Sequence, residues 1–160
     1  MAGKEEKTNA MRILTQCRVP YVMHDYTSTG AISGSEVAKA LGEDPEKVFK
    51  TLVTVGKSGS HYVFMIPVEK ELDLKKGAGV VGEKYIEMIP SKDLLPLTGY
   101  IHGGCSPIGM KKTFMTVIDA SAQNWPQIFF SGGRIGLQVE VPLGDLPRAL
   151  RFTFADVAKD

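Results

Sequence analysis

The chain has 160 residues, of which 43% are hydrophobic and 23% are charged, and its formal net charge is +1. Its length corresponds to about one domain, which is large enough to bury a core without a metal or a disulfide. Nineteen basic residues against eighteen acidic ones exclude a strongly basic surface, so binding of nucleic acid would be local or weak.

The first part of the chain is expected to contain a helix and a short strand. Residues 1–8 are expected to be a flexible start, and residues 9–160 to form the one domain. Apolar residues then recur at helical spacing with Thr8 or Asn9 as the cap, and a strand is expected at residues 21–26.

The pattern then changes from a helix to a hairpin. A compact helix is predicted at residues 33–43, with Gly42 as its stop. Two strands follow at residues 48–56 and 61–68, and the residues KSGS between them have the chemistry of a hairpin turn.

The second half is predicted to be mostly strands. A helix is expected at residues 71–82, a strand at residues 84–89, and a helical turn at residues 90–99 that Pro96 breaks. The remaining expected elements are strands at residues 114–120, 127–133 and 136–142 and a helix that opens near Pro142 or Gly144. Since strands outnumber helices and successive strands are often close enough for hairpins, we predict a single α+β domain with a mixed or antiparallel, barrel-like sheet.

The cysteines, the histidines and the apolar runs of the sequence indicate the cellular compartment and whether a metal or a cofactor is expected. Cys17 and Cys105 are far apart, and the three histidines show no metal-ligand spacing, so we expect no metal and no cofactor. The spacing leaves a disulfide open, but two thiols in such a chain fit a reducing cytosol better. The charged N-terminal segment does not read as a signal peptide, and no apolar run approaches the ~20 residues of a membrane span. We expect a cytoplasmic protein without a membrane partner.

Lys50 lies in a strand in which alternation places it on one face with Val48 and Leu52. The commoner use of such a lysine is to discourage edge-to-edge aggregation or to cover apolar surface with its stem. The other use is an amine at the rim of a half-apolar pocket, which holds an oxygen or a phosphate of a substrate.

A glycine-rich segment, YIHGGCSPIGMKK, occupies residues 100–112. The pair Gly103–Gly104 lets the backbone adopt positive φ and lets a ligand approach its N–H groups. The spacing matches neither GxxxxGK[ST] nor GxGxxG, so the segment alone fits a bulged loop as well as a binding loop.

Two further residues are candidates for chemistry. Ser131 lies in a small-residue turn, FFSGGRIG, where a serine can bond a substrate or its own backbone. Cys105 is the candidate nucleophile, but a nucleophilic thiol needs a lowered pKa, and the sequence does not place His102 or Lys111 against it. We expect Cys105 to be a packing residue.

Five segments, in this order, carry a resemblance that covers nearly the whole chain: VPYVMHDY, GEDPEKVFKTLV, ELDLKKGAGVVG, IPSKDLLPLTGYIHGGCSPIGMKK and FFSGGRIGLQVEVPLGDL. They resemble the YbaK family of aminoacyl-tRNA deacylases, and specifically its Cys-tRNA(Pro) deacylase branch. The fold that this implies is that of a prolyl-tRNA synthetase editing domain, with a curled, mixed and largely antiparallel sheet flanked by helices.

The resemblance implies editing of mischarged tRNA. The implied reaction is hydrolysis of Cys-tRNA(Pro), with Cys-tRNA(Cys) as a further substrate, by attack of the substrate's own thiol on its ester carbonyl. The implied partners are the acceptor end of tRNA(Pro) and prolyl-tRNA synthetase. The alternatives are a deacylase for another amino acid such as alanine, a non-catalytic module that binds tRNA or a synthetase, and a thiol enzyme that uses Cys105.

By position, the resemblance also assigns roles to residues. Lys50 and Thr51 would orient the terminal nucleotide or the aminoacyl carbonyl, and Gly103 and Gly104 would contact the ester through their backbone. The implied catalytic residues are Lys50, Gly103 and Gly104, and the implied substrate-binding residues are Tyr26, Thr51, Ser106, Ser131 and Gln138.

Three positions depart from the pattern of the family. Gln138 stands where an acidic residue is common, so an α-amino group would be held there by a hydrogen bond alone. Cys105 replaces an apolar residue, and Ser33 lies nearest to the place of an expected aromatic pocket wall.

Overall fold

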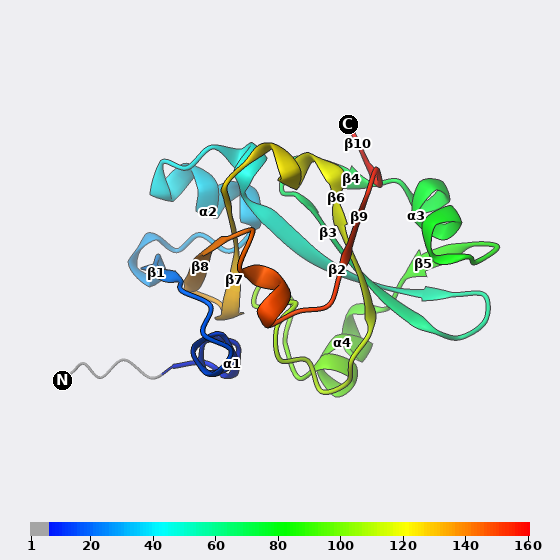
Figure 1. Ribbon diagram of the computed structural model, residues 1–160, viewed down its shortest axis with the longest axis horizontal. Coiled ribbons are helices and arrows are strands. Elements are labelled where there is room, and N and C mark those ends of the chain that lie inside the picture. The colour runs from blue at the N-terminus through cyan, green and yellow to red at the C-terminus, as the bar shows by residue number, and fades with distance from the viewer. Residues whose placement is uncertain (1–6) are drawn as a thin grey trace.

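A five-stranded mixed sheet forms the centre of the chain, which the computed structural model describes for residues 7–160 (Figure 1). Its strands, in spatial order, are β5 (Ile86–Met88), β2 (Phe49–Gly56), β3 (His61–Pro67), β6 (Met115–Asp119) and β9 (Thr153–Ala155). The hairpin expected from KSGS is confirmed, because β2 and β3 pair antiparallel along their whole length. The pairs β3–β6 and β6–β9 are parallel, so each needs a long crossover connection.

Two smaller sheets complete the strands. The first is antiparallel and has the order β1 (Val22–Asp25), β8 (Leu137–Pro142) and β7 (Gln127–Arg134). The second pairs β10 (Ala158–Lys159) with β4 (Glu71–Leu72).

The α+β fold is confirmed, but the sheet is not closed into a barrel. A closed barrel gives every strand two hydrogen-bonded neighbours. Here β5 and β9 have one neighbour each in the five-stranded sheet. One parallel bridge, between Val48 and Phe129, links the start of β2 to β7. The described strands therefore curl together at one place and remain open elsewhere.

The helices are α1 (Asn9–Gln16), α2 (Gly34–Leu41), α3 (Leu74–Val81) and α4 (Ser91–Thr98). In Figure 1, α1 and α2 lie at the end of the molecule that holds β7 and β8, and α3 lies at the end that holds β5. Apolar side chains of α1, β7 and β8 fill the main core between them, including Met11, Leu14, Ile128, Phe130, Val139 and Val141. A second core lies under α3 and includes Phe64, Ile66, Ala78, Ile86 and Val117.

The helix starts follow local capping chemistry. The Thr8 hydroxyl accepts a hydrogen bond from the Met11 N–H at 3.1 Å and donates one to the Gly132 carbonyl at 2.5 Å. The Thr8 side chain is therefore bonded to α1 and to β7, and residues 1–6 of the segment expected to be flexible lie outside the described part of the chain. Ser33 caps α2, and Gly42 ends it at φ 69°, as expected.

Three expected elements are wrong in detail. The helix predicted at residues 71–82 begins only at Leu74, because β4 pairs with β10 and the Asp73 carboxylate caps the helix after it. Pro96 does not break α4, whose last turn is held by the Thr98 hydroxyl donating to the Leu94 carbonyl at 2.7 Å. The region near Pro142 forms only a 3-10 turn, Leu146–Arg148, before the chain returns to the sheet as β9.

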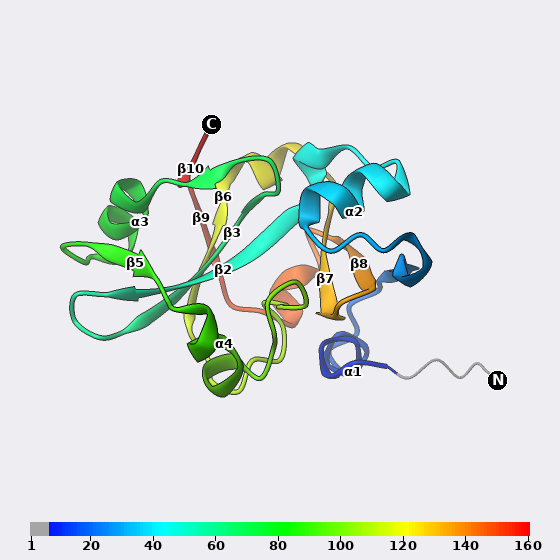
Figure 2. The ribbon, with the colours of Figure 1, turned by 180° about the vertical axis from the view of Figure 1, so that it is seen from behind.

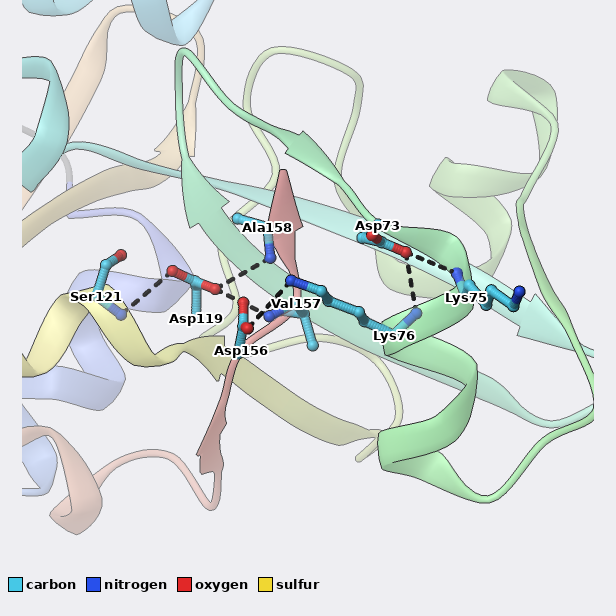
Figure 3. A network of polar contacts seen from close by, with 8 residues as sticks. All are labelled: Asp73, Lys75, Lys76, Asp119, Ser121, Asp156, Val157 and Ala158. Carbon is cyan, nitrogen blue, oxygen red and sulfur yellow. Dashed lines mark hydrogen bonds and ion pairs between the residues drawn. The ribbon is translucent and has the colours of Figure 1, made fainter. Parts of the chain in front are cut away.

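Asp119 holds the C-terminal segment on the sheet (Figure 3). Its carboxylate accepts hydrogen bonds from the N–H groups of Val157, Ala158 and Ser121 at 3.0–3.2 Å. Burial opposes ionisation of Asp119, but these hydrogen bonds outweigh it and hold its pKa below the ordinary value. One buried carboxylate thus joins the end of β6 to the segment that forms β10.

Candidate functional site

A cavity of about 850 Å³ lies where β2 changes neighbours. At its start β2 is bridged to β7 through Val48, and the Val53 carbonyl accepts a hydrogen bond from Ile89 just after β5. Between these points only β3 pairs with β2, so the other side of the strand is open. Consecutive residues Val48–Val53 line the cavity, as expected for a gap in a sheet.

The backbone of Thr51 faces this gap. In an antiparallel ladder, alternate residues direct their N–H and C=O groups toward the same neighbour. The Val53 carbonyl points away from β3, whereas the Val48 carbonyl accepts from Val68 on the side of β3. Thr51 therefore presents its peptide groups on the same side as Val53, toward the cavity.

Other segments close the cavity around β2. They are the ends of β7 and β8, the start of α2, the region between β5 and α4, and the glycine-rich segment, which lies between α4 and β7 in both views (Figures 1 and 2). Six of the sequence-predicted site residues line it: Tyr26, Lys50, Thr51, Gly103, Ser131 and Gln138. Apolar side chains form most of the rest, including Val37, Phe49, Leu52, Leu94, Phe130 and Leu137. Apolar walls with a few convergent polar groups are typical of small-molecule sites.

Lys50 is a half-buried cation in this cavity. Burial lowers the pKa of its ammonium group, and the charge of Glu71 opposes that shift. Among residues 7–160, no carboxylate lies within ion-pair distance of its Nζ atom. The ammonium group is therefore available to an anionic or carbonyl oxygen.

Two buried oxygens in the cavity wall have no hydrogen-bond partner within the described chain. They are Thr51 Oγ1 and Gln138 Oε1. A buried polar atom without a partner costs about 1–3 kcal/mol, so such atoms mark places where a ligand can bind.

The two glycines of the pair differ in role. Gly103 lines the cavity at φ 87°, and no hydrogen bond within the described residues occupies its N–H group. The Gly104 N–H donates to the Ile101 carbonyl at 3.0 Å, and an added Cβ atom would lie 2.9 Å from the Ile135 nitrogen. Gly103 can thus offer an N–H group to a ligand, whereas Gly104 allows close packing against the turn before β8.

The two candidate serines differ in their position relative to the cavity. Ser106 is fully buried outside the cavity lining, and its hydroxyl accepts from the Ile108 N–H at 3.2 Å. Ser131 lines the cavity, and its oxygen accepts from the Gly133 N–H at 3.1 Å. The Ser131 hydroxyl proton can still be donated to a ligand.

Cys105 lies in the cavity wall but is not an activated nucleophile. Burial raises the pKa of its thiol to about 12, so the thiol is neutral at physiological pH. His102 also lines the cavity, and no hydrogen bond joins it to Cys105 within the described chain.

Ser33 and Glu36 form a polar end of the cavity, at the place where an aromatic wall was expected. The Ser33 oxygen accepts from the Glu36 N–H at 3.2 Å, and a Glu36 carboxylate oxygen accepts from the Ser33 N–H at 3.1 Å. Backbone N–H groups, that of Ser33 first and then that of Ile32, lower the pKa of Glu36. Exposed Ile32 contributes apolar surface beside them.

Gln138 is buried, with 2% of its surface exposed, and its amide is anchored from outside the cavity lining. Its Nε2 group donates to a Glu43 carboxylate oxygen at 2.9 Å. Glu43 follows directly after the Gly42 stop of α2, and sequence reasoning missed it. No local pattern indicates this pair, because 95 positions separate the two residues.

Comparison of the sequence with known proteins identifies related chains. The profile of the aminoacyl-tRNA editing domain matches residues 30–149. EbsC of Enterococcus faecalis, a proposed Cys-tRNA(Pro)/Cys-tRNA(Cys) deacylase, is 47% identical over 138 residues, which cover 86% of this chain and 84% of that protein. The chain belongs to the aminoacyl-tRNA editing domain family. The family expected from the sequence motifs is thereby confirmed.

Solved structures show the same editing-domain fold. The crystal structure of a proposed trans-editing enzyme for prolyl-tRNA synthetase has a TM-score of 0.82 at 22% identity and covers 98% of this chain and 100% of its own. The structure of a hypothetical protein has a TM-score of 0.84 at 20% identity, with 95% and 100% of the two chains covered. At these identities the likeness concerns the fold alone.

The described residues include no helix long and apolar enough to cross a membrane. Nor do residues 7–160 hold a group of three or more His, Cys, Asp or Glu side chains arranged for a metal ion.

Proposed function

We propose that this domain, residues 9–160, hydrolyses the aminoacyl ester of mischarged tRNA, with Cys-tRNA(Pro) as its main substrate and Cys-tRNA(Cys) as a further one. The observation that carries the proposal is the cavity at the gap in the sheet. Around an apolar space it gathers a cation, a glycine N–H group and two buried oxygens, and among residues 7–160 the cation has no carboxylate partner and the oxygens accept no hydrogen bond. EbsC, at 47% identity, supports cysteine as the amino acid.

The cavity residues match the parts of an aminoacyl ester. The Lys50 ammonium group binds the ester carbonyl or a phosphate of the terminal nucleotide, and the Gly103 N–H stabilises negative charge on the carbonyl oxygen. The Thr51 and Ser131 hydroxyls orient the ribose or the carbonyl, and Tyr26 forms a wall. The Gln138 carbonyl oxygen accepts a hydrogen bond from the α-ammonium group.

The chemical step uses the substrate's thiol. Its sulfur attacks the ester carbonyl carbon of the same residue, the bond to the ribose oxygen breaks, and the thiol proton passes to that oxygen. The products are a cysteine thiolactone, which water then opens, and uncharged tRNA. The cavity contributes proximity, because it holds sulfur and carbonyl close together. This route agrees with a cavity whose own thiol, that of Cys105, is neutral.

We expect other components of translation to bring the mischarged tRNA to this domain. With a net charge of +1 the chain has little general affinity for phosphate backbones. We therefore expect it to contact the acceptor end of tRNA(Pro) and to act beside prolyl-tRNA synthetase, in the cytoplasm where tRNA is charged. The fold shared with a proposed trans-editing enzyme supports this arrangement.

The test is deacylation by the purified protein of tRNA(Pro) charged with cysteine, alanine, serine or proline. We expect Cys-tRNA(Pro) to be cleaved fastest and Ser-tRNA(Pro) poorly, because a hydroxyl is a weaker nucleophile than a thiol. Equal turnover of the cysteine, alanine and serine esters would point to an activated water instead. Absence of cleavage in the whole panel would support a binding module.

A further inference from the structure

The contact between Glu43 and Gln138 suggests how a neutral side chain recognises a cation. An amide has two ends of opposite polarity, since its oxygen accepts hydrogen bonds and its NH₂ group donates them. Only the oxygen end attracts an ammonium group. A buried glutamine in the wall therefore needs a second group to fix which end enters the cavity.

We propose that Glu43 is the positioning residue that turns the carbonyl oxygen of Gln138 into the cavity. This inference rests on the proposed function and deepens it, because it makes the free α-ammonium group of the aminoacyl ester a requirement for tight binding. An ionised carboxylate only accepts hydrogen bonds, so it holds the NH₂ end of the amide. The 2.9 Å contact from Gln138 Nε2 to Glu43 Oε1 is of this kind.

The second observation is the free end of the same amide. Gln138 Oε1 is buried and has no hydrogen-bond partner within the described residues. Gln138 is among the residues that line the cavity and Glu43 is not, so the anchored NH₂ end of the amide is held by a group outside the lining, and we infer that the oxygen end is the one a cavity ligand meets. A buried acceptor without a partner costs stability unless a ligand supplies a donor.

The surroundings of Glu43 show that its charge is held at some cost. Burial raises the pKa of its carboxyl, and the hydrogen bond from Gln138 and the charge of His24 act in the opposite direction. Glu140 raises that pKa further. Glu140 is itself bonded elsewhere, to His24 Nε2 at 2.9 Å and to Gln127 Nε2 at 3.2 Å. Glu140 is therefore a matched control, because it lies in the same polar cluster and does not touch Gln138.

The experiment compares two esters of tRNA(Pro) in single-turnover deacylation. One carries cysteine, and the other carries 3-mercaptopropionate, which keeps the thiol and the ester and lacks the α-ammonium group. For the wild type we expect KM to be about tenfold lower for cysteine, since hydrogen bonds to charged groups contribute this much. In Glu43→Met this preference should fall to about twofold, and in Glu140→Gln it should remain. The rate with saturating 3-mercaptopropionyl-tRNA should not change in either variant.

Exchanging the two side chains keeps a hydrogen bond between positions 43 and 138 and reverses which of the two residues donates it. In the double variant Glu43→Gln with Gln138→Glu, the new carboxylate faces the cavity directly and both of its oxygens accept. We expect this variant to recover the preference for cysteine. If Glu43→Met does not fold, as judged by thermal unfolding, Glu43→Gln takes its place, because an amide at position 43 can bond either end of the Gln138 amide. An unchanged preference for cysteine in a folded Glu43→Gln variant overturns the proposal.

The remaining outcomes separate the two proposals. A folded Glu43→Met variant with an unchanged preference overturns the role of Glu43 and leaves the deacylase function standing. A wild type that cleaves neither ester overturns both.

Discussion

Lys50 places an ammonium group in a mostly apolar cavity where, among the described residues, no carboxylate neutralises it at ion-pair distance. Its pKa is lowered by burial, so folding pays to keep this charge. Charges kept against stability are common at functional sites, where activity and stability oppose each other. We propose the pocket use for this lysine, because it is half-buried and lines the cavity.

Replacing Lys50 by methionine should therefore separate stability from activity. We expect Lys50→Met to raise the free energy of unfolding by on the order of 1 kcal/mol, since it removes a desolvated charge. If the cation contacts the ester or a phosphate as proposed, deacylation of Cys-tRNA(Pro) should fall at least a hundredfold. Urea denaturation and single-turnover kinetics measure the two effects. A variant that is less stable and fully active would assign Lys50 a structural role.

Cys105 allows a test of where the reacting thiol comes from. A thiol with a pKa of about 12 stays neutral, so Cys105→Ser should change deacylation less than about threefold. Iodoacetamide at pH 7.5 should leave Cys105 largely unmodified, which mass spectrometry of the digested protein would show. Loss of activity in a folded Cys105→Ser variant would instead support the thiol enzyme considered from the sequence.

At the scale of elements, one carboxylate carries much of the attachment of the C-terminal segment (Figure 3). Asp119→Ala leaves the N–H groups of Val157 and Ala158 without their acceptor. We expect this variant to lose about 2–3 kcal/mol of unfolding free energy at pH 7 in urea denaturation. The matched control is Asp156→Ala, which removes an exposed ion pair with Lys76 and should cost less than about 0.5 kcal/mol.

The hydrogen bonds of Asp119 also determine the direction in which the free energy of unfolding changes with pH. The pKa of Asp119 is lower in the folded state than its ordinary value of 3.8. Its contribution is therefore present above pH 4 and is lost as the pH falls through the lower folded value. Wild type and Asp119→Ala should accordingly converge in stability in acid. A difference that stays constant down to pH 2 would contradict this assignment.

What could be predicted at this scale depends on how local the determinants are. The cap at Ser33, the stop at Gly42 and the hairpin at residues 57–60 depend on neighbouring residues, and these features are confirmed. The start of α3 was misplaced, because residues 71 and 72 pair as β4 with residues 159 and 158, and the local signal of the Asp73 cap was not used. Pairing over such distances leaves no signal in the local pattern.

The candidate site also combines residues that a sequence motif indicated with one that no motif indicated. The motif residues Lys50, Thr51, Gly103 and Ser131 line one cavity, and their roles toward a substrate stay predictions. Glu43 had no motif and was missed. Gly104 and Ser106 belong to the motif, yet their polar groups are bonded within their own loop. A motif marks a segment, but only packing decides which of its atoms face the ligand.

At the scale of the molecule, the cavity depends on the sheet remaining open. If β2 had a full-length neighbour on each side, its backbone groups would be bonded to strands and the space would be filled. The predicted barrel would have had this effect. The gap along β2, between its bridge to β7 and its pairing with β5, is therefore the feature of the fold that leaves room for a ligand.

The pairing of β1 with β8 has a consequence for how the protein reaches this state. It joins His24 to Gln138 across more than a hundred residues, and the parallel pairs β3–β6 and β6–β9 are also distant along the chain. Such topologies fold slowly, in milliseconds to seconds, because long loops must close before their contacts form. Walls of the cavity come from both halves of the chain, so the polypeptide can recognise an ester only after the last of these closures.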